Sequence, residues 1–281
     1  MRQIDLHVHS NESDGAFSPS ELVDYAVQKG LCAFALTDHD TTAGLEEAFA
    51  AAEGKPLEVI AGIEFSTEYE GKDIHVLGLD FDYRDVQFQE ELQRFRDSRD
   101  VRNRKMIARL NEAGIAVSWE EMERRFGDAV WTRAHFARFM LDEGYISEMS
   151  EAFERYIGDH GPCFVPREKV TPLQAVRLVR RAGGIPVLAH PFLYHLPEAS
   201  LEELVRQLKK GGLLGIEAVY STHGRFEEEQ VRQLARRMGL CISGGSDFHG
   251  SNKPSIDLGS GKGNLKIPYE ILKQLRAAAG K

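Results

Sequence analysis

Histidine and acidic residues recur at the ends of apolar segments along the whole chain. His7 and His9 belong to the first such segment, a predicted strand, where residues i and i+2 point to the same side and can approach one metal ion. Other segments end at Asp38-His39-Asp40, Glu64, His190, Glu217 to His223 and Asp247 to His249, and one more contains His75. Burying so many unpaired polar groups would be costly, and bound cations would compensate.

The donor types indicate what kind of metal site this is. Imidazoles and carboxylates without thiolates suit Mn, Fe, Co or catalytic Zn better than a structural zinc site. The three cysteines, Cys32, Cys163 and Cys241, are far apart and form no metal or disulfide motif. Adjacent divalent ions activate water and bind phosphate oxygens, so hydrolysis is the expected reaction class.

Seven short apolar segments with helical patterns between many of them predict the fold. The predicted strands are Ile4–Val8, Ala33–Thr37, Leu57–Ile63, Ile74–Leu79, Ile185–Ala189, Leu214–Val219 and Cys241–Gly244. Ser18-Pro19 and Thr171-Pro172 predict helix starts. Gly30, Gly183 and Gly239 follow helical stretches, as glycines that end helices do. Such βα units predict a mostly parallel sheet that closes into a barrel or distorted barrel.

The alternation stops between about residues 85 and 165, where only helices are predicted. Their ranges are Phe88–Glu112, Trp119–Phe126, Thr132–Asp142 and Ser147–Gly158. We therefore expect residues 1–86 and 165–281 to form the barrel and residues 87–164 to form an inserted helical cap domain.

Composition excludes several classes of function. The chain has 281 residues and a formal net charge of −9, with 42% hydrophobic residues, as in ordinary globular proteins. The negative charge argues against coating long duplex nucleic acid. There is no apolar run long enough to span a membrane and no apolar signal core at the start, so a cytoplasmic location is expected.

The motifs together resemble the PHP (polymerase and histidinol phosphatase) family of metal-dependent phosphoesterases, nearly end to end. They are HVHS from His7, LTDHD from Leu36, GIE from Gly62, LAHP from Leu188 and GGSDFHG from Gly244. The segment from Trp131 to Arg138 and the later Phe164-Val165-Pro166 resemble one branch closely. That branch contains 3′,5′-nucleoside bisphosphate phosphatases and 5′-3′ exonucleases that act on short RNA.

The resemblance implies a distorted (β/α)7 barrel with two or three divalent metal ions. One ion would be held by His7, His9, Glu64 and Asp247, a second by Asp14, His39 and His249, and a third by Glu64, His75 and His190. Asp14 replaces a histidine found in many PHP proteins, and this more oxygen-rich site favours Mn, with Fe, Zn and Co as alternatives. His223, Asp247 and His249 are the expected catalytic residues.

A phosphorylated substrate also needs positive groups besides the metals. Arg133 and His135 follow Thr132, a good N-cap, so helix N–H groups could also face a phosphate. Arg167, Ser221 and His223 are further expected phosphate or leaving-group contacts, with a hydrogen-bonding role in support of a ligand as the alternative for His223.

A basic stretch in the first predicted cap helix adds two candidates. Seven basic and two acidic residues lie between Arg94 and Arg109. We hypothesise that Arg99 and Arg102 face the cleft between cap and barrel and attract phosphates. The alternative is that they form salt bridges with Asp97 and Asp100.

The predicted reaction is hydrolysis of the 3′-phosphate of a nucleoside 3′,5′-bisphosphate such as pAp, by attack of a hydroxide that bridges metal ions. One alternative is a 5′-3′ exonuclease on short RNA oligonucleotides, and another is a small-molecule phosphatase of the histidinol phosphate type. An amidohydrolase-type C–N hydrolase would commonly need a lysine at the end of a middle strand, where the chain has none. The last alternative is a non-enzymatic metal-binding module, against which the intact ligand set argues.

Overall fold

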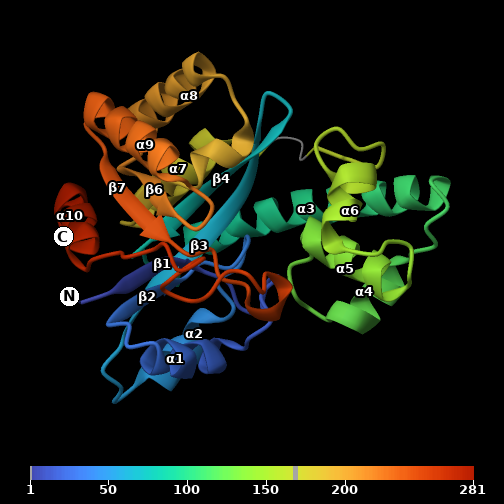
Figure 1. Cartoon of the computed structure of the whole chain (residues 1–281), viewed down its shortest axis with the longest axis horizontal. Coiled ribbons are helices and arrows are strands. Elements are labelled where there is room, and N and C mark those ends of the chain that lie inside the picture. Colours follow the sequence, from blue (N-terminus) through green and yellow to red (C-terminus); the bar gives the residue numbers. More distant parts are fainter. Residues whose placement is uncertain (1, 167–169) are drawn as a thin grey trace.

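A seven-stranded sheet forms the centre of the protein. The computed structural model describes residues 2–166 and 170–281, and the strands follow one another around the sheet in sequence order (Figure 1). They are β1 (Ile4–Val8), β2 (Ala33–Leu36), β3 (Glu58–Tyr69), β4 (Lys72–Leu79), β5 (Ile185–Leu188), β6 (Gly215–Tyr220) and β7 (Cys241–Gly245). The first and last strands are also in contact, so the predicted seven-stranded α/β barrel is confirmed in a nearly closed form.

Closure of the barrel depends on one glycine. A Cβ atom on Gly245 would lie 2.2 Å from the Cβ of His7, closer than two carbon atoms can approach without a bond. Glycine therefore lets β7 come against β1 at the residue that begins the HxH pair.

One strand departs from the predicted parallel arrangement. β4 runs antiparallel to both β3 and β5, whereas the other neighbouring pairs are parallel. The cause is local, because β3 turns directly into β4 through Glu70 and Gly71, whose φ angles are 52° and 76°. A reversed strand begins at the mouth where its neighbours end. This explains why His75 comes early in β4 and still faces the same mouth as the other donors.

Helices cover the outside of the barrel. They are α1 (Pro19–Gln28), α2 (Leu45–Ala52), α7 (Pro172–Arg181), α8 (Glu198–Gly211), α9 (Arg225–Met238) and α10 (Glu270–Ala279). The predicted helix starts are confirmed, since Ser18 and Thr171 cap α1 and α7, each with a proline in the first turn. Gly30, Gly183 and Gly239 have φ angles of 72°, 72° and 60°, as the predicted helix ends require.

The segment between β4 and α7 is helical and lies to one side of the barrel (Figure 1). It contains α3 (Val86–Glu112), α4 (Trp119–Phe126), α5 (Arg133–Asp142), α6 (Met149–Ala152) and the π-helix η1 (Phe153–Ile157). A hydrophobic cluster drawn only from residues 106–165 forms its interior. Phe88, Leu92 and Phe95, in the first half of α3, pack instead into the barrel's cluster. The single long helix α3 thus belongs to both regions.

No helix within residues 2–166 and 170–281 combines the length and apolar character that a membrane span requires.

Asp5 ties together segments from both ends of the chain. Its side chain is buried, and it accepts hydrogen bonds from the backbone N–H groups of Ser246 and Gly259, both at 2.8 Å, and from the Ser246 hydroxyl. Burial raises the pKa of Asp5 to about 6, although these hydrogen bonds act in the opposite direction. The carboxylate therefore helps to fix β1 against the loop that follows β7.

We predict that Asp5→Asn destabilises the fold, because an NH₂ group would face donors that now meet a carboxylate oxygen. The expected decrease in melting temperature is roughly 4–8 °C, from about 2 kcal/mol for a mismatched buried group. Thermal unfolding in chelator measures it, with the exposed Asp24→Asn as control. An unchanged melting temperature for Asp5→Asn would contradict this role.

Candidate metal centre

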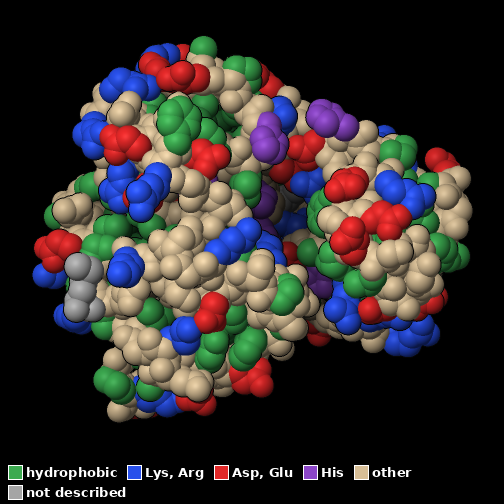
Figure 2. All heavy atoms as spheres, in the orientation of Figure 1, with side chains coloured by type: hydrophobic (Ala, Val, Ile, Leu, Met, Phe, Trp, Pro, Cys, Tyr) green, Lys and Arg blue, Asp and Glu red, His purple; other side chains and the backbone are tan. Residues whose placement is uncertain are grey.

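Nine histidine and carboxylate side chains meet at one mouth of the barrel. They come from β1 and its following loop, the loops after β2, β5 and β7, and the interior of the β3–β4 hairpin. They are His7, His9, Asp14, His39, Glu64, His75, His190, Asp247 and His249, the full set of predicted metal ligands. Histidine and basic side chains lie in and beside the hollow between the barrel and the helical segment (Figure 2).

Glu64 lies at the centre of this cluster. Its Oε2 atom is 3.2 Å from His7 Nε2, 3.1 Å from His9 Nε2 and 3.3 Å from His39 Nδ1. Its Oε1 atom is 2.8 Å from His75 Nδ1 and 3.0 Å from His190 Nε2. One carboxylate thus contacts five imidazoles, a position suited to bridging two cations.

The donors fall into overlapping groups whose ligand atoms lie within 4.8 Å of one another. The groups are His9, Asp14, His39 and His249; His7, Glu64 and His190; His7, His9 and Asp247; and His39, Glu64 and His75. The predicted second set, Asp14, His39 and His249, recurs with His9 added. The other two predicted sets do not recur unchanged. Glu64 groups once with His190 and once with His75, and no single group contains all three.

Several atoms in the cluster fit a bound cation because they lack a hydrogen-bond partner. Among the described residues, the buried atoms His7 Nε2, His9 Nδ1 and Nε2, Asp14 Oδ1 and His190 Nδ1 make no hydrogen bond of suitable geometry, although His7 Nε2 and His9 Nε2 lie within 3.2 Å of Glu64 Oε2. Unpartnered buried polar atoms are rare in folded proteins. Imidazole nitrogen and carboxylate oxygen are donors for divalent transition metals, so this set fits such ions.

Without cations, the carboxylates and imidazoles compensate one another's charges. Burial alone would raise the pKa values of Glu64 and Asp14, but the surrounding histidines hold both pKa values well below their usual range. Burial lowers the pKa of His9, yet Asp247, Glu64 and Asp14 outweigh it and raise that pKa to about 9. Protons and metal ions would therefore compete for the same atoms.

Residues around the cluster orient the ligands. The Glu217 carboxylate lies 3.1 Å from His7 Nδ1, which leaves His7 Nε2 facing Glu64, and it also accepts the backbone N–H of His190. Asp38 accepts hydrogen bonds from the backbone and hydroxyl of Ser10 and from the hydroxyl of Ser13, and so holds the loop between His9 and Asp14. Asp38 thus supports the metal ligands from outside the cluster.

Asp247 is oriented by two donors on the same oxygen. The Tyr220 hydroxyl and the Lys253 ammonium each donate to Oδ2 at 2.7 Å. Oδ1 is left 3.4 Å from His9 Nε2 and 3.6 Å from His7 Nε2. Asp247 also has a φ angle of 58°, an unusual backbone conformation for a non-glycine residue, which aims its side chain into the mouth.

Most arginines predicted to bind substrate are engaged within the protein. Arg133 forms ion pairs with Asp73 at 2.8 Å and Asp159 at 3.0 Å. Buried Arg99 donates to Asp40 Oδ2, from Nε at 3.0 Å and from Nη2 at 2.5 Å, and not to Asp97 or Asp100. Arg102 is buried beside a cavity between α3 and α7. Arg167 lies outside the described residues.

The other predicted contacts are buried near the mouth. The Ser221 hydroxyl donates to the Ser246 carbonyl at 2.6 Å. His223 Nδ1 lies 3.0 Å from the Ala218 carbonyl, while its buried Nε2 has no hydrogen-bond partner among the described residues. His135 lines a hollow together with Asp14 and His249.

Asp40 does not cap the helix after β2, because α2 begins after Gly44 and has no side-chain cap. The Asp40 carboxylate instead pairs with Arg99 and accepts the backbone N–H of Ser66. Its φ angle of 51° turns the chain directly after His39.

Sequence analysis missed the roles of Tyr220, Lys253 and Thr132. Thr132 caps α5 as predicted, but its hydroxyl also lies 2.8 Å from Asp14 Oδ2 and donates to it. These contacts join residues far apart in the chain. Of the three, only Lys253 lies near its partner in the sequence, six positions after Asp247.

A seven-stranded α/β barrel with a cluster of imidazoles and carboxylates at one mouth defines the class of metal-dependent hydrolases. A family model of the PHP domain matches residues 5–158, more than half of the chain. The chain therefore belongs to the PHP family, and it is a phosphoric ester hydrolase of that family.

Individual relatives cover nearly the whole chain. The 3′,5′-nucleoside bisphosphate phosphatase of Chromobacterium violaceum is 34% identical over 99% of this chain and 98% of its own length. A 5′-3′ exoribonuclease of Haemophilus influenzae is 36% identical over 88% of this chain and 90% of its own. A solved structure from Chromobacterium violaceum, described as an amidohydrolase with bound sulfate and no metal, is 33% identical with a TM-score of 0.87, over 98% of this chain and 96% of the other.

We predict that Thr132→Val weakens metal binding, because Asp14 loses the donor that orients it. Loss of such a supporting contact typically lowers metal affinity about 10–100-fold. Thr132→Ser keeps the hydroxyl, and with it both the helix cap and the donor to Asp14, so it should bind metal like the wild type. Calorimetric titration with Mn²⁺ measures both, and wild-type affinity in Thr132→Val would exclude the coupling.

We also predict a pH-dependent contribution of His135 to stability. Burial lowers the pKa of His135 to about 4, below its usual 6.5. Between pH 6.5 and 4 the unfolded chain therefore binds a proton at His135, whereas the folded chain does not. The stability that neutral His135 contributes above pH 6.5 is lost as the pH falls through this range.

His135→Gln removes this titration and retains a side chain that can cap the Thr132 N–H. We compare the loss of unfolding free energy between pH 7 and 4.5 in the presence of a chelator. That loss should be about 2 kcal/mol smaller for His135→Gln than for the wild type. Urea unfolding at the two pH values measures the difference, and parallel losses would show that His135 titrates normally.

Proposed function

We propose that the protein hydrolyses the 3′-phosphate of nucleoside 3′,5′-bisphosphates, using two or three divalent ions with Mn as the favoured metal. The observation that carries this proposal is the group of nine donors around Glu64 at one barrel mouth. A bisphosphate phosphatase that matches this chain over 98% of its own length supports the choice of substrate. The free thiols of Cys32, Cys163 and Cys241 support a reducing, cytoplasmic location.

A hollow beside the metal centre is suited to a small nucleotide. It has a volume of about 390 Å³, within the range of small-molecule sites. Asp14 and His249 form its inner wall, and Phe126, His135 and Arg138 of the helical segment form its outer wall. We infer that this segment acts as a cap that closes over the substrate.

Side chains of the protein would orient the metal ligands and bind the reacting phosphate. Divalent ions, when bound, supply Lewis acidity and activate water as a nucleophile. Glu217 keeps His7 Nε2 directed at the centre, and Tyr220 and Lys253 do the same for Asp247 Oδ1. Lys253, Arg133 and His135 are our candidates for binding phosphate oxygens, together with Arg167. Arg133, Lys253, Arg99 and Ser221 would have to share their present contacts in order to do so, and Arg102 lies at a separate cavity between α3 and α7.

His223 is our candidate for donating a proton to the leaving alkoxide. Its Nδ1 must carry hydrogen, because the Ala218 carbonyl beside it only accepts. A second proton would therefore sit on Nε2, the atom without a partner. The ring centroid of His223 is 5.1 Å from that of Tyr220, and the Tyr220 centroid is 5.3 Å from that of His190. The Tyr220 ring therefore lies between His223 and the metal ligands.

A 5′-3′ exoribonuclease acting on short RNA is the second candidate, because a matching relative carries that name. An amidohydrolase reaction has less support, although one similar solved structure is so described. The lysine at this mouth, Lys253, follows β7 and pairs with Asp247, whereas that mechanism commonly uses a lysine from a middle strand.

The decisive experiment measures phosphate release by Mn-loaded protein from pAp, AMP, histidinol phosphate and a 5′-phosphorylated dinucleotide. We expect pAp to be hydrolysed best and Glu64→Gln to lose at least about 100-fold in kcat/KM, since Glu64 belongs to two of the groups of donors. The exposed Glu203→Gln is the matched control. Turnover of the dinucleotide alone would favour the exonuclease, and inactivity on every phosphoester would contradict both candidates.

A further inference from the structure

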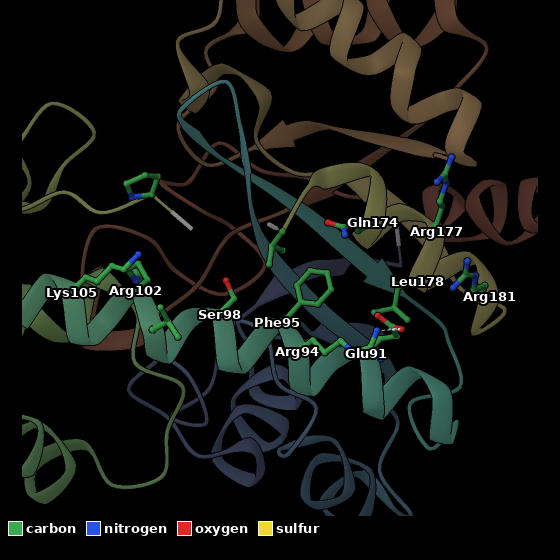
Figure 3. Close-up of a pocket in the computed structure, with 13 residues that line it drawn as sticks. Glu91, Arg94, Phe95, Ser98, Arg102, Lys105, Gln174, Arg177, Leu178 and Arg181 are labelled. Carbon is green, nitrogen blue, oxygen red and sulfur yellow. Dashed lines mark hydrogen bonds and ion pairs between the residues drawn. The ribbon is translucent and has the colours of Figure 1, made fainter. Parts of the chain in front are cut away.

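A second cavity lies between α3 and α7, outside the barrel. Its volume is about 590 Å³ (Figure 3). The residues of α3 that line it, among them Glu91, Arg94, Phe95, Ser98 and Arg102, recur at helical spacing and so form one face of the helix. Gln174, Arg177 and Arg181 line it from α7. It belongs neither to the metal centre nor to the hollow beside Asp14.

The cavity is positively charged in a negatively charged protein. Among the described residues, Arg94, Arg102, Lys105, Arg177 and Arg181 line it, together with the carboxylate of Glu91. Arg94 is paired with Glu91 at 2.7 Å. Arg177 and Arg181 are exposed, and neither has a carboxylate partner among the described residues. Like charges one helical turn apart repel each other, so the two arginines are suited to binding an anion.

The wall also contains apolar surface and an amide. Phe95, Leu178 and Val170 are buried beneath the cations, and the ring of Phe95 faces the middle of the cavity (Figure 3). Gln174 uses its side-chain oxygen to accept from the backbone of Thr171, which leaves its NH₂ group on the cavity side. An aromatic ring, an amide donor and guanidinium groups together are suited to a base and its phosphates.

The cavity and the metal centre lie on opposite faces of β3. Glu64 and Ser66 point inward, to the cluster of imidazoles. Phe65, between them, points outward and packs against Phe95 at a centroid distance of 4.9 Å. The α3 helix contacts both sites, through Arg99 on one side and Phe95 on the other. A ligand in the cavity therefore need not touch a metal ligand.

We propose that this cavity is a second binding site for nucleotide phosphates, either a free nucleotide or the downstream nucleotides of a short RNA. The second source rests on the metal centre of the proposed function and on its exoribonuclease alternative, because the 5′ end of that RNA would occupy that centre. The first source is independent of it.

Arg177→Ala/Arg181→Ala tests the proposal in the Mn-loaded protein. The probes are AMP and a 5′-phosphorylated pentanucleotide with phosphorothioate linkages, which resist hydrolysis. We expect the double variant to bind the pentanucleotide at least about tenfold more weakly and to lower the slope of log affinity against log salt by about 1.4, from two lost phosphate contacts.

Arg232→Ala/Arg236→Ala is the matched control, because it removes two arginines at the same spacing from α9, outside the cavity, of which Arg236 is exposed and Arg232 half-buried. Weaker pentanucleotide binding alone assigns the cavity to downstream RNA, and loss of a second AMP-binding event assigns it to a free nucleotide. Unchanged binding of both probes overturns the proposal. Hydrolysis of pAp is followed in parallel and should be unchanged, whereas its absence in the wild type would contradict the proposed function and leave the assignment to a free nucleotide standing.

Discussion

The structure depends on a buried carboxylate, Glu64, that five imidazoles surround. A carboxylate in such a place is stable only when positive charge compensates it, from protonated histidines or from metal ions. Strands from both halves of the barrel supply that charge, so the centre can form only when the barrel closes. The contacts of Glu217, Asp38, Tyr220 and Lys253 then limit each ligand to one orientation.

The sequence was sufficient to predict the strands, the barrel and the donor residues, since every donor but Asp14 adjoins or lies within an apolar segment, and Asp14 followed from the resemblance to the PHP family. It also contained a signal for the reversed β4, because Glu70-Gly71 separates two strand-like runs in the manner of a hairpin turn. It did not contain the contacts of Arg99 with Asp40 or of Thr132 with Asp14. Those pairs are set by how α3 and α5 pack on the barrel, which residue spacing does not encode.

The basic stretch of α3 shows how one pattern can serve two purposes. Spacing alone placed Arg99 and Arg102 on a common face. In the folded protein Arg99 compensates a buried aspartate next to a metal ligand, whereas Arg102 borders a cavity on the outer side of β3. Because the helix is buried in both cores, the same rigid element holds its two arginines at two separate places.

The hairpin of β3 and β4 has a consequence for how the chain folds. Glu64 and His75 are eleven positions apart and meet through local pairing, which in hairpins forms on the order of microseconds. His7 and Asp247 must instead wait for almost the entire polypeptide, and contacts of such long sequence separation form slowly. A chain that is still being synthesised therefore brings Glu64 and His75 together well before the barrel is complete. Metal bound by this pair would bias the order in which the strands assemble.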